Sequence, residues 1–126
     1  MSFDLLVFPP SGPATAAEVR RLLDAEEQRL ISGGDSALPP LGPEMARFMD
    51  EIKHRWPSPE DDPDGSPWTI EPGWEPSLGG GLGLAIKWSC PDSVLIAIFE
   101  VAGRTGVIVY DPQAEVVHRP GGAAAR

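Results

Sequence analysis

The sequence predicts an α+β domain. Short apolar runs of strand length lie near both ends of the chain, and two segments between them carry apolar residues at helical spacing. The last third then shows strand, helix and strand patterns in succession, which joins two strands by a crossover. This order of elements fits a ferredoxin-like sandwich, in which a small mixed sheet has helices packed on one face. A different α+β sheet built from the same elements is the alternative.

The first half of the chain predicts one strand and two helices. "FDLLVF" (residues 3–8) is a short apolar run stopped by two prolines, which is typical of a buried strand. "TAAE" at 15–18 is a capping box, so a helix begins there and ends at Gly33-Gly34. A second helix begins near Pro43 and ends before Pro57. Its apolar residues follow i, i+3, i+4, i+7 spacing, namely Met45, Phe48, Met49 and Ile52.

The second half predicts a strand, a helix and two more strands. "LGLAIKWS" (82–89) alternates, and Leu82, Leu84, Ile86 and Trp88 are expected to face one way. "SCPD" offers Ser89 or Asp92 as the N-cap of a helix that runs to about Gly103–Gly106. "GVIVYDP" predicts a strand parallel to the one that begins at Leu82, and the helix between them makes a right-handed crossover. "AEVVHRP" predicts a short antiparallel edge strand. We expect one domain over residues 1–120 and a flexible tail over 121–126.

Composition and charge argue against several classes of partner. The chain of 126 residues has a formal net charge of -9, whereas binding to nucleic acid phosphates or to an anionic membrane needs clustered Lys and Arg. The charge suits a basic protein partner, or it is the ordinary acidity of many bacterial cytosolic proteins. A single cysteine excludes an internal disulfide. The N-terminus lacks a signal-peptide pattern, and no apolar run reaches transmembrane length, so we expect a cytoplasmic protein.

Residues 57–81 form a long loop rich in proline, glycine and acidic side chains, and the sequence does not define its path. We expect Trp68 and Trp74 to pin this loop to the domain, because large aromatic rings are usually buried. The segment "WTI" at 68–70 is a candidate for a short edge strand.

The stretch "EDDPDGSPWTIE" (60–71) has the spacing of a calcium loop, with acids at alternate positions, a glycine at the sixth and a glutamate at the twelfth. Two features argue against calcium. Pro63 and Pro67 stiffen the loop, and no helix can flank it, because Pro57 ends the preceding helix and Pro72 follows. We therefore expect an acidic surface loop, with no metal and no cofactor.

Other reactive side chains give weaker signals. His54, His118 and Cys90 are too few for a zinc site, and His54 late in a helix suits the helix dipole. Cys90 at a helix start has either a lowered thiolate pKa or the role of a structural cysteine, which is the commoner case. No nucleophile motif accompanies it.

Asp111 and Gln113 stand just past the end of a predicted strand. Ligand sites in α/β sheets favour that edge, so a pocket between Trp68, Trp88, Asp111 and Gln113 is one interpretation. The other is a simple turn, since Asp-Pro opens turns well, and we favour the turn.

Five short segments resemble those of a family of small uncharacterised bacterial proteins that end in a "YDPQ" motif. They are "DLLVF", "RWP" (55–57), "SPW" (66–68), "IKWS" (86–89) and "TGVIVYDPQ" (105–113), and together they extend from about Asp4 to Gln113. The resemblance implies an immunity-type or interaction protein and supplies no catalytic residues. It also implies that the Ser66–Trp68 segment and the Tyr110–Gln113 turn share one surface.

The sequence thus predicts a non-enzymatic, acidic protein-binding module, such as an immunity-type protein that covers a basic partner. A small-ligand binder or an enzyme, with a pocket near Trp68, Trp88, Asp111 and Gln113, is the alternative. The residues expected to contact a partner are Glu60, Asp61, Asp62, Asp64, Trp68 and Trp74.

Overall fold

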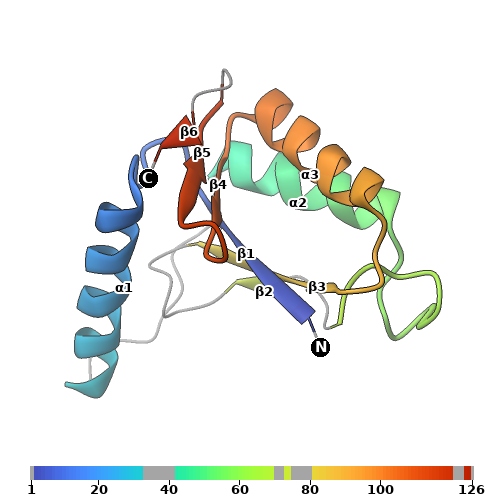
Figure 1. Cartoon of the computed structure of the whole chain (residues 1–126), viewed down its shortest axis with the longest axis horizontal. Coiled ribbons are helices and arrows are strands. Elements are labelled where there is room, and N and C mark those ends of the chain that lie inside the picture. The colour runs from blue at the N-terminus through green and yellow to red at the C-terminus, as the bar shows by residue number, and fades with distance from the viewer. Residues whose placement is uncertain (1, 33–41, 70–72, 75–80, 121–123, 126) are drawn as a thin grey trace.

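A computed structural model describes residues 2–32, 42–69, 73–74, 81–120 and 124–125. In these ranges it holds three helices and six strands (Figure 1). The helices are α1 (Ala16–Ile31), α2 (Pro43–Arg55) and α3 (Asp92–Thr105). The strands are β1 (Ser2–Phe8), β2 (Gly73–Trp74), β3 (Leu82–Lys87), β4 (Ile108–Asp111), β5 (Val116–His118) and β6 (Ala124–Ala125). The predicted α+β class is confirmed.

The strands form one sheet in the order β2-β3-β1-β4-β5-β6, and every pairing is antiparallel. β1 lies in the middle and pairs with β3 from Ser2↔Lys87 to Val7↔Leu82. On its other edge β1 pairs with β4 from Leu6↔Tyr110 to Phe8↔Ile108. The predicted mixed sheet is therefore wrong. β3 and β4 run in the same direction, but β1 lies between them, so they do not form the adjacent parallel pair that we expected.

Six of the elements, β1-α2-β2-β3-α3-β4, follow the β-α-β-β-α-β order of a ferredoxin-like chain. α1, β5 and β6 stand outside that order. The ferredoxin-like assignment itself stays a prediction.

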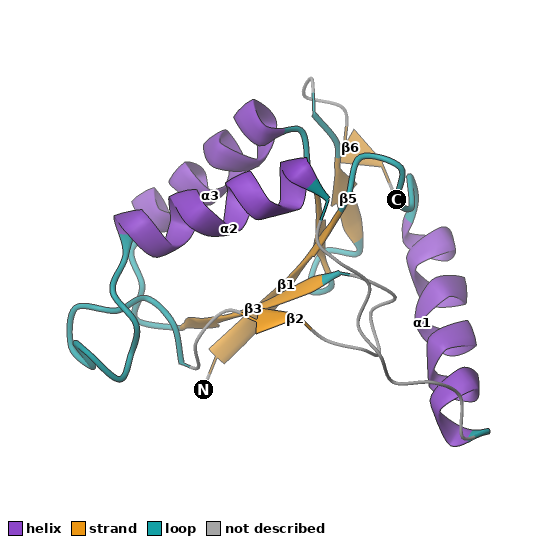
Figure 2. Ribbon diagram, turned by 180° about the vertical axis from the view of Figure 1, so that it is seen from behind, coloured by secondary structure: helices purple, strands orange, loops and turns teal. Residues whose placement is uncertain are grey.

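Helices cover both faces of the sheet (Figure 2). Alternate β1 side chains point to opposite faces, so Leu5 and Val7 join one buried cluster while Phe8 joins another. The larger cluster lies under α2 and α3 and includes their buried residues Phe48, Ile52, Ile98 and Val101. The second cluster lies under α1 and includes Ala16, Val19, Ile108, Tyr110 and Val117. The expectation that all helices pack on one face is wrong for α1.

The helix starts follow local chemistry. The Glu18 N–H donates to Thr15 Oγ1 at 3.2 Å, as the capping box predicts. The second bond differs from the prediction, because Glu18 Oε2 accepts from the Ala14 N–H at 2.7 Å and not from that of Thr15. α2 begins after Gly42 with Pro43 in its first turn. The predicted N-caps of α3 are wrong, because Pro91 takes the N-cap position and no side chain caps that end.

Other local predictions have mixed outcomes. Of "WTI", the structure describes residues 68 and 69, where Trp68 makes an isolated bridge to Ile86, and Ile70 lies outside the described residues. The described strand at this edge is β2. β5 is antiparallel to β4 as expected. Ala124–Ala125, within the expected tail, pair with β5 as β6, so β5 is not an edge strand.

Gly106 ends α3 in a left-handed conformation with φ of 84°, and its N–H donates to the Ala102 carbonyl. A Cβ at Gly106 would approach nothing closer than 3.9 Å, so the cost of a side chain there is a backbone cost. A Cβ at Gly103, within the same helix, would meet no heavy atom of the described residues within 4 Å. Alanine at these two positions therefore compares the free-energy cost of a left-handed backbone conformation with the effect of a side chain that meets no close neighbour.

We expect Gly106→Ala to lower the free energy of unfolding by roughly 1–2 kcal/mol, since L residues disfavour this conformation. Gly103→Ala is the control. It should raise the free energy of unfolding by roughly 0.4–1 kcal/mol, because alanine restricts the unfolded chain and favours helix. Urea unfolding of both variants measures the two values. Equal effects would show that the left-handed C-cap is absent.

Candidate functional site

The acidic loop, residues 57–67, connects the end of α2 to the edge of β3 and carries its own hydrogen bonds. The amides of Asp61 and Asp62 donate to the Ser58 carbonyl at 3.1 and 3.0 Å. The Ser66 N–H donates to the Asp62 carbonyl at 3.0 Å, and Asp62 Oδ1 accepts from the Gly65 N–H at 2.9 Å. The loop is thus a series of turns closed by main-chain and aspartate acceptors.

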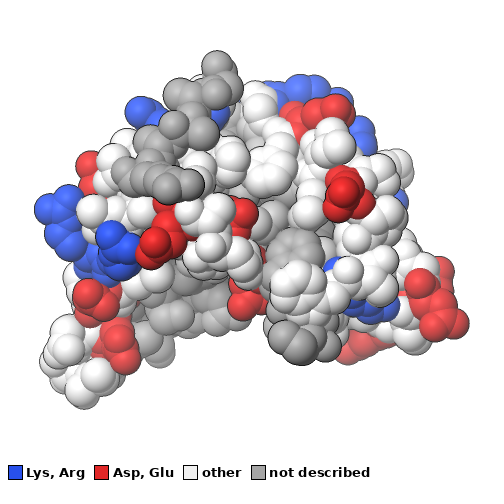
Figure 3. Space-filling view, in the orientation of Figure 1, with Lys and Arg blue, Asp and Glu red and all other residues white. Residues whose placement is uncertain are grey.

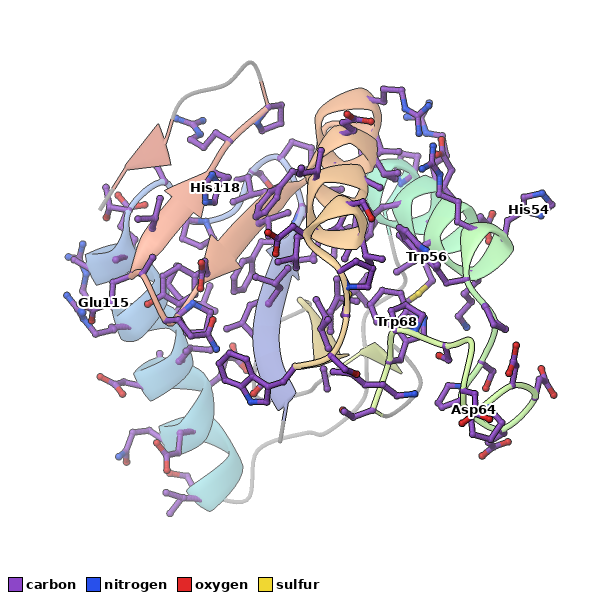
Figure 4. All side chains as sticks on the ribbon, turned by 45° about the vertical axis from the view of Figure 1, so that its right-hand side comes forward. His54, Trp56, Asp64, Trp68, Glu115 and His118 are labelled. Carbon is purple, nitrogen blue, oxygen red and sulfur yellow. The ribbon has the colours of Figure 1, made fainter. Side chains whose placement is uncertain are left out.

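Trp68 anchors this loop to the domain. Its side chain is 1% exposed and belongs to the larger buried cluster. The backbone on either side bridges to β3, because the Thr69 N–H donates to the Ala85 carbonyl and the Lys87 N–H to the Pro67 carbonyl, both at 2.9 Å. The Trp68 ring also meets Trp56 edge-on, with centroids 5.7 Å apart and planes at 88° (Figure 4).

The two tryptophans predicted to pin the loop have different outcomes. The prediction is confirmed for Trp68. The same burial contradicts the expectation that Trp68 contacts a partner protein, since a side chain that is 1% exposed cannot reach one. The side chain of Trp74 lies outside the described residues, although its backbone forms β2.

Four carboxylates project from the acidic loop, those of Glu60, Asp61, Asp62 and Asp64, and all four are exposed. Figure 3 shows acidic side chains gathered at the lower right, where the loop lies. Within the described part of the chain, no ion pair joins any of the four to a Lys or Arg. Two ion pairs of the described residues lie elsewhere, between Arg104 and Glu51 at 2.5 Å and between Arg20 and Glu115 at 2.8 Å.

The described residues contain no group of three or more His, Cys, Asp and Glu side chains placed to hold a metal ion. Glu71, which closes the calcium-like spacing, lies outside the described residues. Asp62 has one carboxylate oxygen bound to the Gly65 amide, so it shapes the turn.

A pocket of about 440 Å³ lies between the acidic loop, the end of β3 and the start of α3. Sequence reasoning missed it, because its walls come from four separate segments. These are Trp56, residues 63–67, Lys87 and residues 89–91, with Val94 on the first turn of α3. The predicted ligand pocket was placed elsewhere: Trp68, Trp88, Asp111 and Gln113 do not line this one.

Three polar side chains of the pocket wall have hydrogen-bond partners. The Lys87 ammonium donates to the Pro63 carbonyl and ties the loop to β3. Ser66, only 3% exposed, accepts the Trp68 N–H at 3.2 Å through Oγ. The Cys90 thiol donates to the Pro91 carbonyl, with Sγ 3.4 Å from the oxygen.

Burial raises the pKa of the Cys90 thiol above its ordinary value, and the Asp92 carboxylate raises it further. The lowered pKa expected for a cysteine at a helix start is therefore not found, because burial and, after it, the Asp92 carboxylate disfavour the thiolate. Cys90 is a protonated thiol at neutral pH and lacks the activation of a nucleophile.

Trp88 follows the end of β3 and Asp111 ends β4, on either side of β1, and neither lines this pocket. β3 ends at Lys87, and the Cys90 N–H donates to the Lys87 carbonyl, so the chain turns and leaves Trp88 55% exposed. Asp111 Oδ1 accepts from the amides of Gln113 and Ala114 at 2.9 and 3.4 Å, which confirms the turn interpretation.

The two segments expected to share a surface lie apart. Trp68 belongs to the cluster under α2 and α3, while Tyr110 belongs to the cluster under α1, so they lie on opposite faces of the sheet. The histidines are also apart. His54 is exposed in the last turn of α2, whereas the His118 ring lies 4.6 Å from that of Phe99 (Figure 4).

Comparison with protein-family models, with curated protein sequences and with solved structures finds no match for this chain. The resemblance to the family with a "YDPQ" motif stays a prediction. Of the helices that the structure describes, none has the length and apolar character needed to cross a membrane.

We expect Trp68→Ala to lower the free energy of unfolding by about 3–5 kcal/mol, because it empties a buried site beneath the loop. The control is Trp88→Ala, an equal change on a half-exposed ring, which should cost about 1 kcal/mol or less. Denaturant unfolding measures both. Similar losses in the two variants would contradict the assignment of Trp68 as the anchor.

The pH dependence of Cys90 alkylation tests the electrostatics of the pocket. Only the thiolate reacts, so a raised pKa should move the rise in rate to higher pH than for a free cysteine. Asp92→Asn removes one of the two causes, so the pKa should fall while staying raised by burial. Asp61→Asn, an equal charge change outside the pocket wall, is the control. An unchanged profile in Asp92→Asn would contradict the electrostatic contribution.

Proposed function

We propose that this protein is a non-enzymatic binding module whose acidic loop meets a basic segment of a partner protein. One observation carries the proposal. Four exposed carboxylates stand together on the loop at 60–64 without an ion pair in the described part of the chain, on a segment that buried Trp68 fixes to the sheet.

Two physical effects support this role. A cluster of like charges attracts an opposite cluster and raises the association rate, and the net charge of -9 adds to this field. The loop is also held by its own hydrogen bonds and by the bridge to β3. Less conformational entropy is therefore lost when a partner orders the loop than would be lost from a free chain.

An immunity-type role, in which the protein covers a basic toxin in the cytoplasm, is the more specific form of this proposal. The acidic charge and the sequence resemblance support it. A gene for a large secreted toxin next to this one would favour this form over a general interaction role.

The pocket favours a second candidate, a small-ligand binder. Its volume of about 440 Å³ lies within the range of about 300–1,000 Å³ that ligand sites occupy. An enzyme is favoured less, because the thiol in the pocket has a raised pKa and neither histidine lines the wall.

The binding proposal is tested with a variant that neutralises the loop, Glu60→Gln, Asp61→Asn, Asp62→Asn and Asp64→Asn. Asparagine at 62 keeps an oxygen for the Gly65 amide. Immobilised wild type should retain a protein from the native lysate that the variant does not retain, identified by mass spectrometry. With that protein purified, the variant should associate at least about tenfold more slowly at low salt.

The matched control removes four exposed carboxylates from the helices instead, in Asp24→Asn, Glu27→Gln, Asp50→Asn and Glu100→Gln. It has the same net charge as the loop variant and should retain the partner. Equal retention by the loop variant and wild type would refute the proposal. Retention of a metabolite and no protein would favour the small-ligand alternative instead.

A further inference from the structure

We propose that the pocket beside the acidic loop accepts the guanidinium group of an arginine side chain from the partner protein. This inference rests on the proposed function and adds the chemistry of one specific contact. It stands on the shape of the pocket, the groups in its wall and the charges around it.

The pocket is built for a long side chain with a flat end. Trp56, half-buried at the end of α2, contributes an aromatic ring, and Pro63, Pro67 and Pro91 contribute apolar surface. A guanidinium group stacks on an aromatic face, and the methylene stem of arginine packs along apolar surface. Figure 4 shows Trp56 beside the buried Trp68, which holds the Trp56 ring from one side.

Asp64 supplies the opposite charge. Asp64 lines the pocket, is exposed, and has no ion pair with a Lys or Arg in the described residues. A carboxylate in this position can accept two parallel N–H bonds from a guanidinium group. Glu60, Asp61 and Asp62 on the same loop add to the negative potential at the pocket mouth.

Among the described residues, Lys87 is the one cation in the pocket wall, and the carboxylates of Asp64 and of the rest of the acidic loop outnumber it. The Lys87 ammonium donates to the Pro63 carbonyl. Burial and the Asp92 carboxylate both raise the pKa of the Cys90 thiol. Burial disfavours a charge of either sign, whereas the Asp92 carboxylate disfavours an anion beside it and favours a cation.

Ser66 provides a polar group at the buried side of the pocket. Its side chain is 3% exposed and its Oγ accepts the Trp68 N–H, which leaves a second lone pair on the oxygen. In the described part of the chain its hydroxyl donates to no acceptor. An occupant with several N–H donors, as in arginine, satisfies such an oxygen better than an apolar group does.

The single cysteine of the chain makes the pocket measurable. Cys90 lies in the wall, so a bound side chain slows its alkylation by N-ethylmaleimide. The probes are N-acetylarginine amide, N-acetyllysine amide and the neutral isostere N-acetylcitrulline amide. The arginine compound should slow alkylation several-fold at saturation, the lysine compound less, and the citrulline compound not at all.

Two variants locate the effect. Asp64→Asn should abolish the protection, whereas Asp61→Asn should keep it, because Asp61 lies on the same loop with the same charge but does not line the pocket. Alkylation without any probe checks that both variants fold as the wild type does. No protection by the arginine compound, or equal protection by citrulline, would overturn the inference.

The variants Asp64→Asn and Asp61→Asn also distinguish this inference from the proposed function. With the purified partner, Asp64→Asn should weaken binding at least several-fold more than Asp61→Asn. Equal losses would mean that the loop acts as a diffuse charged surface, which overturns the arginine pocket and leaves the proposed function standing. Protection by the arginine compound without any loop-dependent protein partner would overturn both statements and indicate a free guanidino compound as the ligand.

Discussion

The burial of Trp68 against β3 is the contact on which the site depends. A proline-rich segment with four acidic side chains has little apolar surface of its own, so its turns alone cannot fix it to the domain. Trp68 supplies that surface, and the bridge to Ile86 adds two backbone hydrogen bonds to the edge of the sheet. The edge-on contact with Trp56 then holds the two ends of the loop together.

The position of β1 sets the rest of the architecture. Because β1 bonds to both β3 and β4, its alternate side chains build two separate buried clusters, one under α2 and α3 and one under α1. The first cluster places the end of β3 and the start of α3 beside the acidic loop. The pocket is therefore a consequence of the fold and of the anchor together, and its wall holds both apolar residues and the polar residues Asp64, Ser66 and Lys87.

Local patterns predicted the elements well, and long-range pairing accounts for most of the errors. The spacing of Met45, Phe48, Met49 and Ile52 identified α2, and the alternation of Leu82, Leu84 and Ile86 identified β3, since each pattern reports burial of one face. Nothing in the sequences of β3 and β4 indicates that β1 lies between them. The alternation also continued to Trp88, past the true end of β3. The ligand pocket was expected beside Asp111 and Gln113 at the end of β4, whereas the pocket found lies beside the acidic loop. The actual pocket joins residues that lie far apart in the chain, and the "SPW" and "IKW" segments that border it carry no local pattern that would pair them.

Native-state hydrogen exchange measured by NMR tests the central claim most directly, because it reports the opening of individual backbone bonds. The anchor predicts that the Thr69 and Lys87 amides, which bond across the bridge at 2.9 Å, exchange about as slowly as the β3 amides that bond to β1. The Ser66 amide should show protection as well, since it closes the last turn of the loop. Exchange of the Thr69 and Lys87 amides at the rate of an unstructured peptide, with β3 otherwise protected, would contradict a fixed loop and the site built upon it.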